Sequence, residues 1–237
     1  HDITLTSIAP RSPMGIEGTE HLSVAQKLYY EPSKSLSLQA YGSMFFMNSY
    51  DLIQDMTFSQ SRDFMAGIKL KYDVKDWFTV NLSLHGDFYD RFKRHERIDE
   101  RKNVYKSKIF EPRLTLTSSY FIGHNIIFGV EHTTDELTSD RFVNRRMTTR
   151  SLHETEYFLQ DEWTVNSHWM LSSGVRTNFS KAFGFMWMPK IAIKYAPDNH
   201  WALRANYSMG YRAPSIKELF FNWDHLGMFQ IKGSENL

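Results

Sequence analysis

Cysteine is absent from this sequence of 237 residues, and neither sign of charge predominates. Without cysteine the chain can form no disulfide framework and no thiolate metal site. Its 28 basic and 27 acidic residues give a formal net charge of +1 and are spread along the chain. Because nucleic-acid-binding proteins concentrate positive charge on one surface, this balance excludes nucleic acid as an expected partner.

Long hydrophobic runs are also missing. No stretch of about 18 uncharged apolar residues occurs, so the sequence predicts no transmembrane helix, and this chain could cross a bilayer only as strands. The first residues, His1-Asp2-Ile3-Thr4, lack the basic stretch and apolar block of a signal peptide. We expect either a processed protein or a segment that begins inside a longer one.

Aromatic residues, in contrast, make up 15% of the chain, although the mean hydropathy is only −0.47. The two values are compatible if strands alternate polar and apolar side chains. Alternation is clearest between Trp77 and Phe92 and again between Trp201 and Arg212. In the first stretch the apolar positions are Phe78, Val80, Leu82, Leu84, Phe88 and Phe92, and the polar ones are Thr79, Asn81, Ser83, His85, Asp87 and Arg91.

About ten strands are predicted in all, many of them long. The other segments with this pattern are residues 20–30, 36–50, 62–73, 107–120, 125–135, 153–164, 169–180 and 186–196. Many match or exceed the roughly 9–11 residues that a tilted strand needs to cross a bilayer. Long alternating strands therefore favour an outer-membrane β-barrel wall, although a soluble β-sandwich can show the same composition.

The connections between these strands are of two kinds. Short turns rich in Pro, Gly, Asn and Asp are predicted at residues 31–34, 73–76, 122–125, 165–168 and 196–199. Long polar stretches, predicted as loops, lie near 51–61, 92–106, 136–152 and after 212. Short periplasmic turns that alternate with long outer loops are typical of outer-membrane barrels.

Three tryptophans, Trp77, Trp169 and Trp201, follow short turns at the starts of strands. This is the position of an interfacial aromatic girdle, and the alternative is the core of a sandwich. Ten strands form an incomplete wall compared with the 22 of a plugged transporter. We therefore expect residues 1–237 to form part of an all-β, antiparallel, up-and-down transmembrane barrel of the larger, 22-strand type.

The segment from Ala205 to Phe220, which contains Tyr211-Arg212-Ala213-Pro214 and a later Glu-Leu pair, resembles the barrel of TonB-dependent outer-membrane receptors. Two further segments are similar to recurrent barrel motifs of that family: Phe158-Leu159-Gln160-Asp161-Glu162-Trp163 and Gly174-Val175-Arg176. The resemblance implies a transporter in the outer membrane of a Gram-negative bacterium. It also implies a plug domain, which this sequence lacks, through which the TonB complex supplies energy.

Within that family, the chain resembles haem and haemoglobin receptors most. They carry a Phe-Arg-Ala-Pro box, a histidine and an Asn-Pro-Asn-Leu box, and here Tyr211-Arg212-Ala213-Pro214, His225 and Ser234-Glu235-Asn236-Leu237 follow in that order. The second box keeps only its Asn and Leu. The resemblance implies haem as the transported ligand, taken directly or from a haemoprotein or surface lipoprotein, and no intrinsic cofactor.

The resemblance also implies four ligand-binding residues: Tyr211, Arg212, His225 and Met228. The imidazole of His225 would bind haem iron, with Met228 as a softer alternative, and Arg212 together with Lys217 would pair with the haem propionates. Two other interpretations stay open. His225 could be a solvated loop histidine, and Arg212 could be a structural residue of the polar inner wall.

Other functions remain as alternatives. A ferric siderophore or cobalamin receptor would use the same machinery, and a passive porin would need neither the Arg-Ala-Pro box nor a plug. An enzyme is not expected, because the chain has no Gly-x-Ser-x-Gly nucleophile elbow. The histidines form no tight ligand cluster with a carboxylate, so no metal centre other than the haem iron is predicted.

Overall fold

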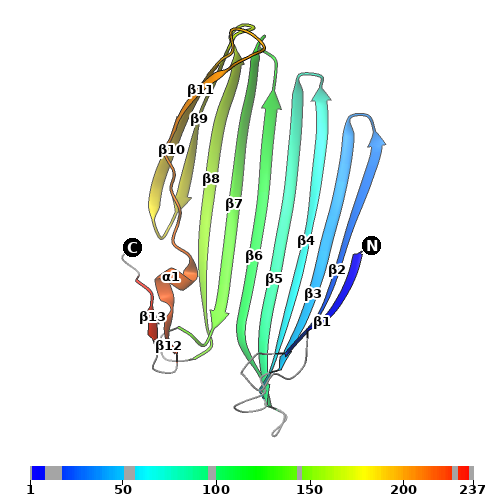
Figure 1. Ribbon diagram of the computed structural model, residues 1–237, viewed down its shortest axis with the longest axis vertical. Helices are drawn as coiled ribbons and strands as arrows, with labels where there is room; N and C mark the ends of the chain where they lie inside the picture. The colour runs from blue at the N-terminus through cyan, green and yellow to red at the C-terminus, as the bar shows by residue number, and fades with distance from the viewer. Residues whose placement is uncertain are drawn as a thin grey trace.

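The computed structural model describes residues 2–8, 18–50, 57–95, 100–142, 146–225 and 229–234 (Figure 1). These residues form one large sheet, one short helix and one small hairpin. The sheet strands are β1 (Asp2–Ile8), β2 (Gly18–Ser33), β3 (Leu36–Tyr50), β4 (Thr57–Lys75), β5 (Phe78–His95), β6 (Glu100–Ser118), β7 (His124–Ser139), β8 (Thr148–Thr164), β9 (Trp169–Ser180), β10 (Gly184–Tyr195) and β11 (Leu203–Ser208). Helix α1 (Ile216–Phe220) and the hairpin of β12 (Asn222–His225) and β13 (Phe229–Lys232) follow.

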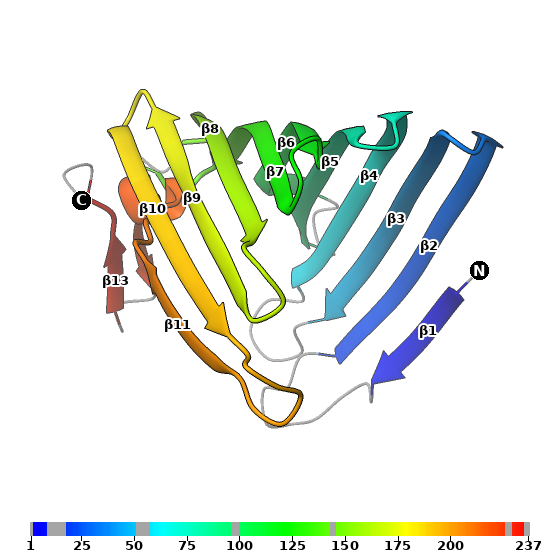
Figure 2. The ribbon, with the colours of Figure 1, turned by 90° about the horizontal axis from the view of Figure 1, so that it is seen from above.

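The large sheet is an antiparallel meander in which each strand pairs with its neighbours in the sequence. Its order runs from β1 to β11 without a crossover, so β1 and β11 are its two edges among the described residues. The sheet is curved and twisted, and it does not close on itself (Figure 2). The prediction of an antiparallel up-and-down barrel portion of about ten strands is confirmed.

The register gives the sheet a polar face and an apolar face. On β5, Thr79, Asn81 and Ser83 belong to the polar face, and Leu82 and Leu84 lie on the apolar face with their partners on β4 and β6. Side chains of the apolar face are widely exposed, among them Leu28 at 60%, Ile68 at 54%, Trp187 at 59% and Tyr207 at 63%. An exposed apolar surface of this extent indicates a nonpolar surrounding.

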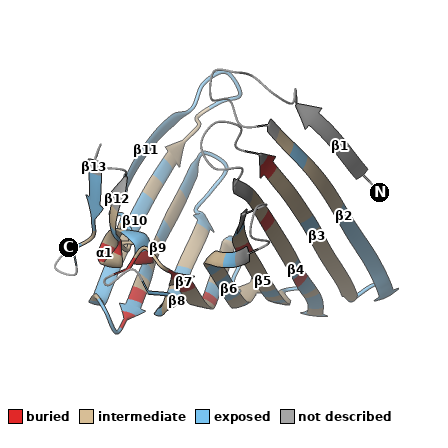
Figure 3. Ribbon diagram, turned by 90° about the horizontal axis from the view of Figure 1, so that it is seen from below, coloured by how far each residue is buried: buried red, intermediate tan, exposed pale blue. Residues whose placement is uncertain are grey.

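Few residues are buried, and most of the buried apolar ones gather around α1 (Figure 3). Among the described residues the buried apolar cluster consists of Leu137, Phe142, Leu152, Ile216, Leu219 and Phe221. No second sheet covers the apolar face in the described part of the chain, so the sandwich alternative is wrong. No described helix is long and apolar enough to span a membrane.

The predicted short turns all lie at one end of the sheet, at the top of Figure 1. The three tryptophans lie there too, and each is partly exposed: Trp77 at 41%, Trp169 at 40% and Trp201 at 53%. Other aromatic rings lie beside them: the ring centroids of Trp77 and Tyr120 are 5.0 Å apart, and those of Trp169 and Tyr195 are 4.3 Å apart. This arrangement is that of an aromatic girdle at one boundary of an apolar band.

Several predicted boundaries are wrong. Much of 92–106 and of 136–152 is strand rather than loop, because backbone pairing continues to His95↔Glu100 and Ser139↔Thr148 after the apolar alternation has ended. The predicted strand from Trp201 to Arg212 is shorter, since β11 covers only Leu203–Ser208. The stretch after 212, predicted as a loop, contains α1 and the β12–β13 hairpin.

Candidate functional site

Helix α1 begins directly after Pro214 and is defined by a capping box. Ser215 is the N-cap, with φ −74° and ψ 160°, and its hydroxyl accepts a hydrogen bond from the Glu218 amide at 3.3 Å. In return, the Glu218 carboxylate accepts from the Ser215 amide at 2.8 Å. These reciprocal bonds satisfy backbone donors that a five-residue helix would otherwise leave unpaired, so Ser215 and Glu218 determine where the helix starts.

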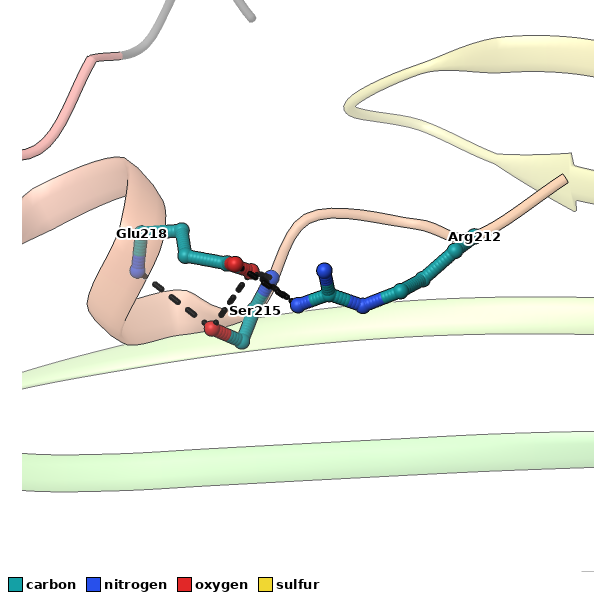
Figure 4. Close-up of polar contacts among 3 residues, drawn as sticks. All are labelled: Arg212, Ser215 and Glu218. Atoms are coloured by element: carbon teal, nitrogen blue, oxygen red, sulfur yellow. Dashed lines mark hydrogen bonds and ion pairs between the residues drawn. The ribbon is translucent and has the colours of Figure 1, made fainter.

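Arg212 is joined to the same carboxylate (Figure 4). One guanidinium nitrogen, Nη2, lies 2.6 Å from Oε1 and 2.8 Å from Oε2 of Glu218. The Ser215 amide, the Arg212 guanidinium and the Ser215 hydroxyl together lower the pKa of Glu218 from 4.5 to about 2. The segment after β11 and the helix are therefore held to each other by an ion pair at neutral pH.

The underside of α1 packs on the polar face of the large sheet. Ile216 is 1% exposed and Leu219 is 4% exposed, and both belong to the cluster with Leu137 of β7 and Leu152 of β8. The hairpin after the helix is anchored as well, since the Asn222 amide donates to the Arg141 carbonyl at 2.9 Å. This packing fixes α1 over the wall and leaves Lys217 exposed.

A cavity of about 420 Å³ lies beside α1, lined by Asp63, Tyr89, Arg91, Val104, Tyr105, Ser107, Arg141 and Lys217. We call it the cationic cavity, because its lining contains three cations and one carboxylate. The cations come from three separate parts of the chain: Arg91 from β5, Arg141 from the segment after β7, and Lys217 from α1. The residues of β5 and β6 that line the cavity, such as Tyr89, Arg91 and Ser107, belong to the polar face, so the cavity opens on that face.

Each cation is held by neutral groups. The Nε of Arg91 donates to the Ser59 hydroxyl at 2.9 Å, and the Arg141 guanidinium lies 4.3 Å from the centre of the Trp223 ring. The Lys217 ammonium lies 5.2 Å from the centre of the Tyr105 ring. None of the three has a carboxylate within ion-pair distance among the described residues. Their charges remain available to an anionic ligand.

Polar groups that could orient a ligand accompany the cations. The Tyr89 hydroxyl donates to Ser61 at 3.1 Å, and the Tyr89 and Tyr105 rings meet edge to face at 5.6 Å. One carboxylate oxygen of Asp63 is buried and has no hydrogen-bond partner. It can accept a hydrogen bond from a ligand hydroxyl or amide. The described residues contain no cluster of three or more His, Cys, Asp or Glu that could hold a metal ion.

Of the four predicted ligand-binding residues, the structure describes the side chains of Tyr211 and Arg212. Tyr211 is half-buried between β11 and α1, where burial and the nearby Glu154 carboxylate raise its pKa. Arg212 pairs with Glu218. His225 is the last residue of β12, opposite Phe229, and its side chain lies outside the described part; Met228 lies outside it altogether.

Sequence reasoning missed most of the cationic cavity. Lys217 was proposed as an anion-binding residue, but Arg91, Tyr105 and Arg141 were not. The alternation already placed Arg91 on the polar face, and Ser215-x-x-Glu218 is a readable capping box. What no pattern could supply was the β5–β6 register and the docking of α1, which bring Arg91 and Lys217 to one cavity.

Comparison with known proteins gives one family. The model described as TonB dependent receptor-like, beta-barrel, matches residues 20–237. The iron-regulated outer membrane virulence protein of Vibrio cholerae, from an El Tor strain, is 25% identical over 164 residues, which cover 67% of this chain and 24% of that protein. The chain thus spans about a quarter of the length of the curated relatives it matches.

Solved structures share the fold at low identity. The siderophore receptor PirA of Acinetobacter baumannii has a TM-score of 0.72 at 11% identity, with 87% of this chain and 35% of that chain covered. A mutant of the ferric enterobactin receptor PfeA of Pseudomonas aeruginosa has a TM-score of 0.74 at 13% identity, with the same coverage. The ferric-catecholate import receptor Fiu of E. coli has a TM-score of 0.65 at 10% identity, covering 81% and 43%.

Proposed function

Because the chain belongs to the TonB-dependent receptor-like β-barrel family, we propose that it is the barrel part of an outer-membrane importer whose cargo is an anionic ferric chelate of the siderophore class. In such a barrel the polar face lines the lumen and the apolar face meets lipid. The observation that carries the proposal is the cationic cavity on the polar face, whose cations Arg91, Arg141 and Lys217 form no ion pair with a carboxylate among the described residues.

The cavity suits a negatively charged ligand for electrostatic reasons. Three cations around a space of about 420 Å³ attract an anion, and the surrounding barrel wall limits their screening by water. The two tyrosines add flat aromatic surface and hydroxyl groups, which suit a ligand built of aromatic rings and oxygen donors. The names of the related proteins, which include siderophore, enterobactin and catecholate receptors, agree with this class of cargo.

Haem is the second candidate cargo. Its two propionates would suit the same cations, and the β12–β13 hairpin that carries His225 follows directly after α1, the helix that contributes Lys217. Import of either cargo would draw its energy from the TonB complex through a plug domain. The two candidates differ in the group that binds iron, because a siderophore supplies its own oxygen ligands, whereas haem needs an axial side chain such as His225.

The first test measures ferric enterobactin binding to the full-length protein in detergent, by quenching of tryptophan fluorescence. Loss of a charged hydrogen bond of about 1.5–3 kcal/mol weakens binding roughly 10- to 100-fold, and we expect this for Arg141→Gln and for Lys217→Gln. The matched control is Lys194→Gln, which removes a lysine on the polar face of β10, outside the cavity. Equal affinity of Lys217→Gln and Lys194→Gln would contradict the proposed site.

A haemin titration of the same protein separates the two cargoes. A saturable Soret shift that weakens in His225→Ala, without binding of ferric enterobactin, would establish haem as cargo. Tight binding of ferric enterobactin that is unchanged in His225→Ala would establish the siderophore class.

A further inference from the structure

A pair of histidines lies on the outward face of the sheet, where β7 and β8 leave the apolar band on the side away from the short turns. On β7 the outward apolar positions end at Val130, and the next outward residue is His132. On β8 they end at Tyr157, and Thr155 and His153 follow on the same face. The pair therefore lies beyond the hydrocarbon layer, where water and dissolved ions reach it.

The two imidazoles are brought together by the register of β7 and β8. His132 lies opposite Thr155 and His153 lies opposite Thr134, so the two histidines are diagonal neighbours on one face. Their ring centres are 6.1 Å apart, and their ring planes are inclined by 16°. Two imidazoles that bind one ion through nitrogens at about 2.0–2.1 Å have ring centres about 5–6 Å apart, so the pair is already close to the spacing that a shared ion requires.

One nitrogen of each ring faces the same atom. Nε2 of His132 and Nδ1 of His153 each lie 3.3 Å from the hydroxyl oxygen of Thr134. Because good hydrogen bonds between such groups measure about 2.7–3.0 Å, these two are weak. An ion can therefore replace the hydroxyl as the common partner of the two nitrogens, and the rings need only turn toward each other.

The surroundings of His132 suit it to bind an ion. Its Nδ1 lies 2.9 Å from the Thr155 hydroxyl, and donation to that oxygen leaves Nε2 with a free lone pair directed at Thr134. A hydrogen bond of this kind from the second ring nitrogen is the usual support of a metal-binding histidine. On the same outward face Lys108 is paired with Glu136 at 3.4 Å, so its charge is balanced and opposes a bound cation little.

We propose that His132 and His153 bind one divalent transition-metal ion on the outward face of the wall, between the two nitrogens that now share the Thr134 hydroxyl. Imidazole is a preferred ligand of Cu²⁺, Ni²⁺ and Zn²⁺. Among the described residues no third His, Cys, Asp or Glu joins the pair, so water completes the coordination shell and the ion stays exchangeable. The inference goes beyond the proposed cargo, because both histidines lie on the face opposite the cationic cavity.

A shared ion would tie β7 to β8 on the outward side. On the inward side the same two strands carry Leu137 and Leu152, on which α1 packs. An ion bound by both rings therefore opposes the separation of the two strands beneath the helix, whereas an ion bound by one ring does not. At an ion concentration of 100 times the dissociation constant, local opening of this strand pair should slow about 100-fold.

The first experiment titrates the full-length protein in detergent with Cu²⁺ and follows binding by electron paramagnetic resonance, which reports nitrogen ligands through their hyperfine couplings. We expect one Cu²⁺ at this site, bound by two imidazole nitrogens. His132→Gln and His153→Gln should each weaken binding at least about tenfold, since loss of an outer-shell partner alone costs about 10- to 100-fold. The matched control is His168→Gln, a histidine of the β8–β9 turn whose Nδ1 lies 3.2 Å from the Ser167 hydroxyl.

Three results would overturn the site. The first is equal Cu²⁺ affinity of the wild type and His132→Gln, and the second is a spectrum with a single nitrogen ligand. The third is a loss of affinity in His168→Gln as large as that in His132→Gln, which would mean that copper binds to exposed histidines in general.

Amide hydrogen exchange with and without Cu²⁺ tests the link between the strands. Exchange in β7 and β8 should slow in the wild type and in His168→Gln, and should not change in His132→Gln or His153→Gln. Unchanged exchange in the wild type at saturating Cu²⁺ would mean that the two rings do not share one ion, and the proposal would then fail.

Each variant is also tested for heat-resistant gel mobility, which reports a folded barrel, and separately for ferric enterobactin binding. Folded His132→Gln that keeps its chelate affinity and loses Cu²⁺ supports the metal site. Failure of the wild type to bind ferric enterobactin, with Cu²⁺ bound as expected, counts against the cationic cavity alone. The two proposals can therefore fail separately.

Discussion

The docking of α1 on the barrel wall depends on Leu219, and its truncation to alanine is the perturbation whose size the structure defines best. Leu219 is 4% exposed and packs in the cluster with Leu137 and Leu152. Such Leu→Ala changes cost about 2–5 kcal/mol, from lost burial and the cavity left behind. A helix of five residues has almost no stability of its own, so this cost acts directly on its docking.

A cost of only 2 kcal/mol raises the undocked population of α1 roughly 30-fold. We expect the amides of Leu219 and Phe221, which donate to Ser215 and Lys217 at 3.1 Å, to exchange hydrogen at least 30-fold faster. The measurement is amide hydrogen exchange by mass spectrometry on the full-length protein in detergent. Chelate affinity should fall in parallel, because Lys217 leaves the cationic cavity with the helix.

The control is Leu203→Ala, the same truncation at a leucine that is 64% exposed on the apolar face. It should leave exchange in α1 unchanged. Two results would refute the reasoning. Unchanged protection of α1 in Leu219→Ala would mean that the cluster does not hold the helix, and an equal loss of protection across β9 and β10 would mean that α1 is not a separate unit.

Two further predictions concern charge and packing. The pKa of Glu218 is about 2 in the folded protein and ordinarily 4.5, so its ionised carboxylate stabilises α1 fully above about pH 4.5, and this stabilisation is lost as pH falls through about 2. We expect slower amide exchange in α1 of the wild type than of Glu218→Gln above pH 4.5, and a difference that disappears as pH falls toward 2. Gly129→Ala places a Cβ 2.1 Å from the Phe158 ring, which must move, so we expect the free energy of unfolding in urea to fall by about 1–3 kcal/mol. The control is Gly210→Ala, where a Cβ would meet no atom within 4 Å.

Strand identity was predictable because a barrel wall repeats one simple rule. On β5 the apolar side chains from Phe78 to Phe88 all lie on the apolar face, so the alternation in the sequence directly predicts which face each side chain occupies. The rule fails where charged residues follow one another, as in Lys93-Arg94-His95, and there the continued strands at residues 92–95 and 100–106 were predicted as loop. Backbone pairing in those parts owes nothing to side-chain polarity.

The candidate site was predictable only in part. Long-range register and the packing of α1 bring Arg91, Arg141 and Lys217 together, and neither leaves a periodic trace in the sequence. Arg212 and His225 were predicted as ligand-binding residues because they lie in or near a short sequence motif that resembles one of a known family. The binding roles proposed for Tyr211, Arg212, His225 and Met228 stay predictions.

Arg212 and the cations of the cationic cavity differ in the partners that their charges have. The guanidinium of Arg212 is already engaged with Glu218 at 2.6 Å, and binding a ligand directly would require it to give up that ion pair. Among the described residues, Arg141 and Lys217 form no ion pair within 4 Å; each lies over an aromatic ring, and Lys217 also interacts electrostatically with Asp135. If the cationic cavity binds the cargo as proposed, Arg212 contributes through its ion pair with Glu218, which holds in place the helix that carries Lys217.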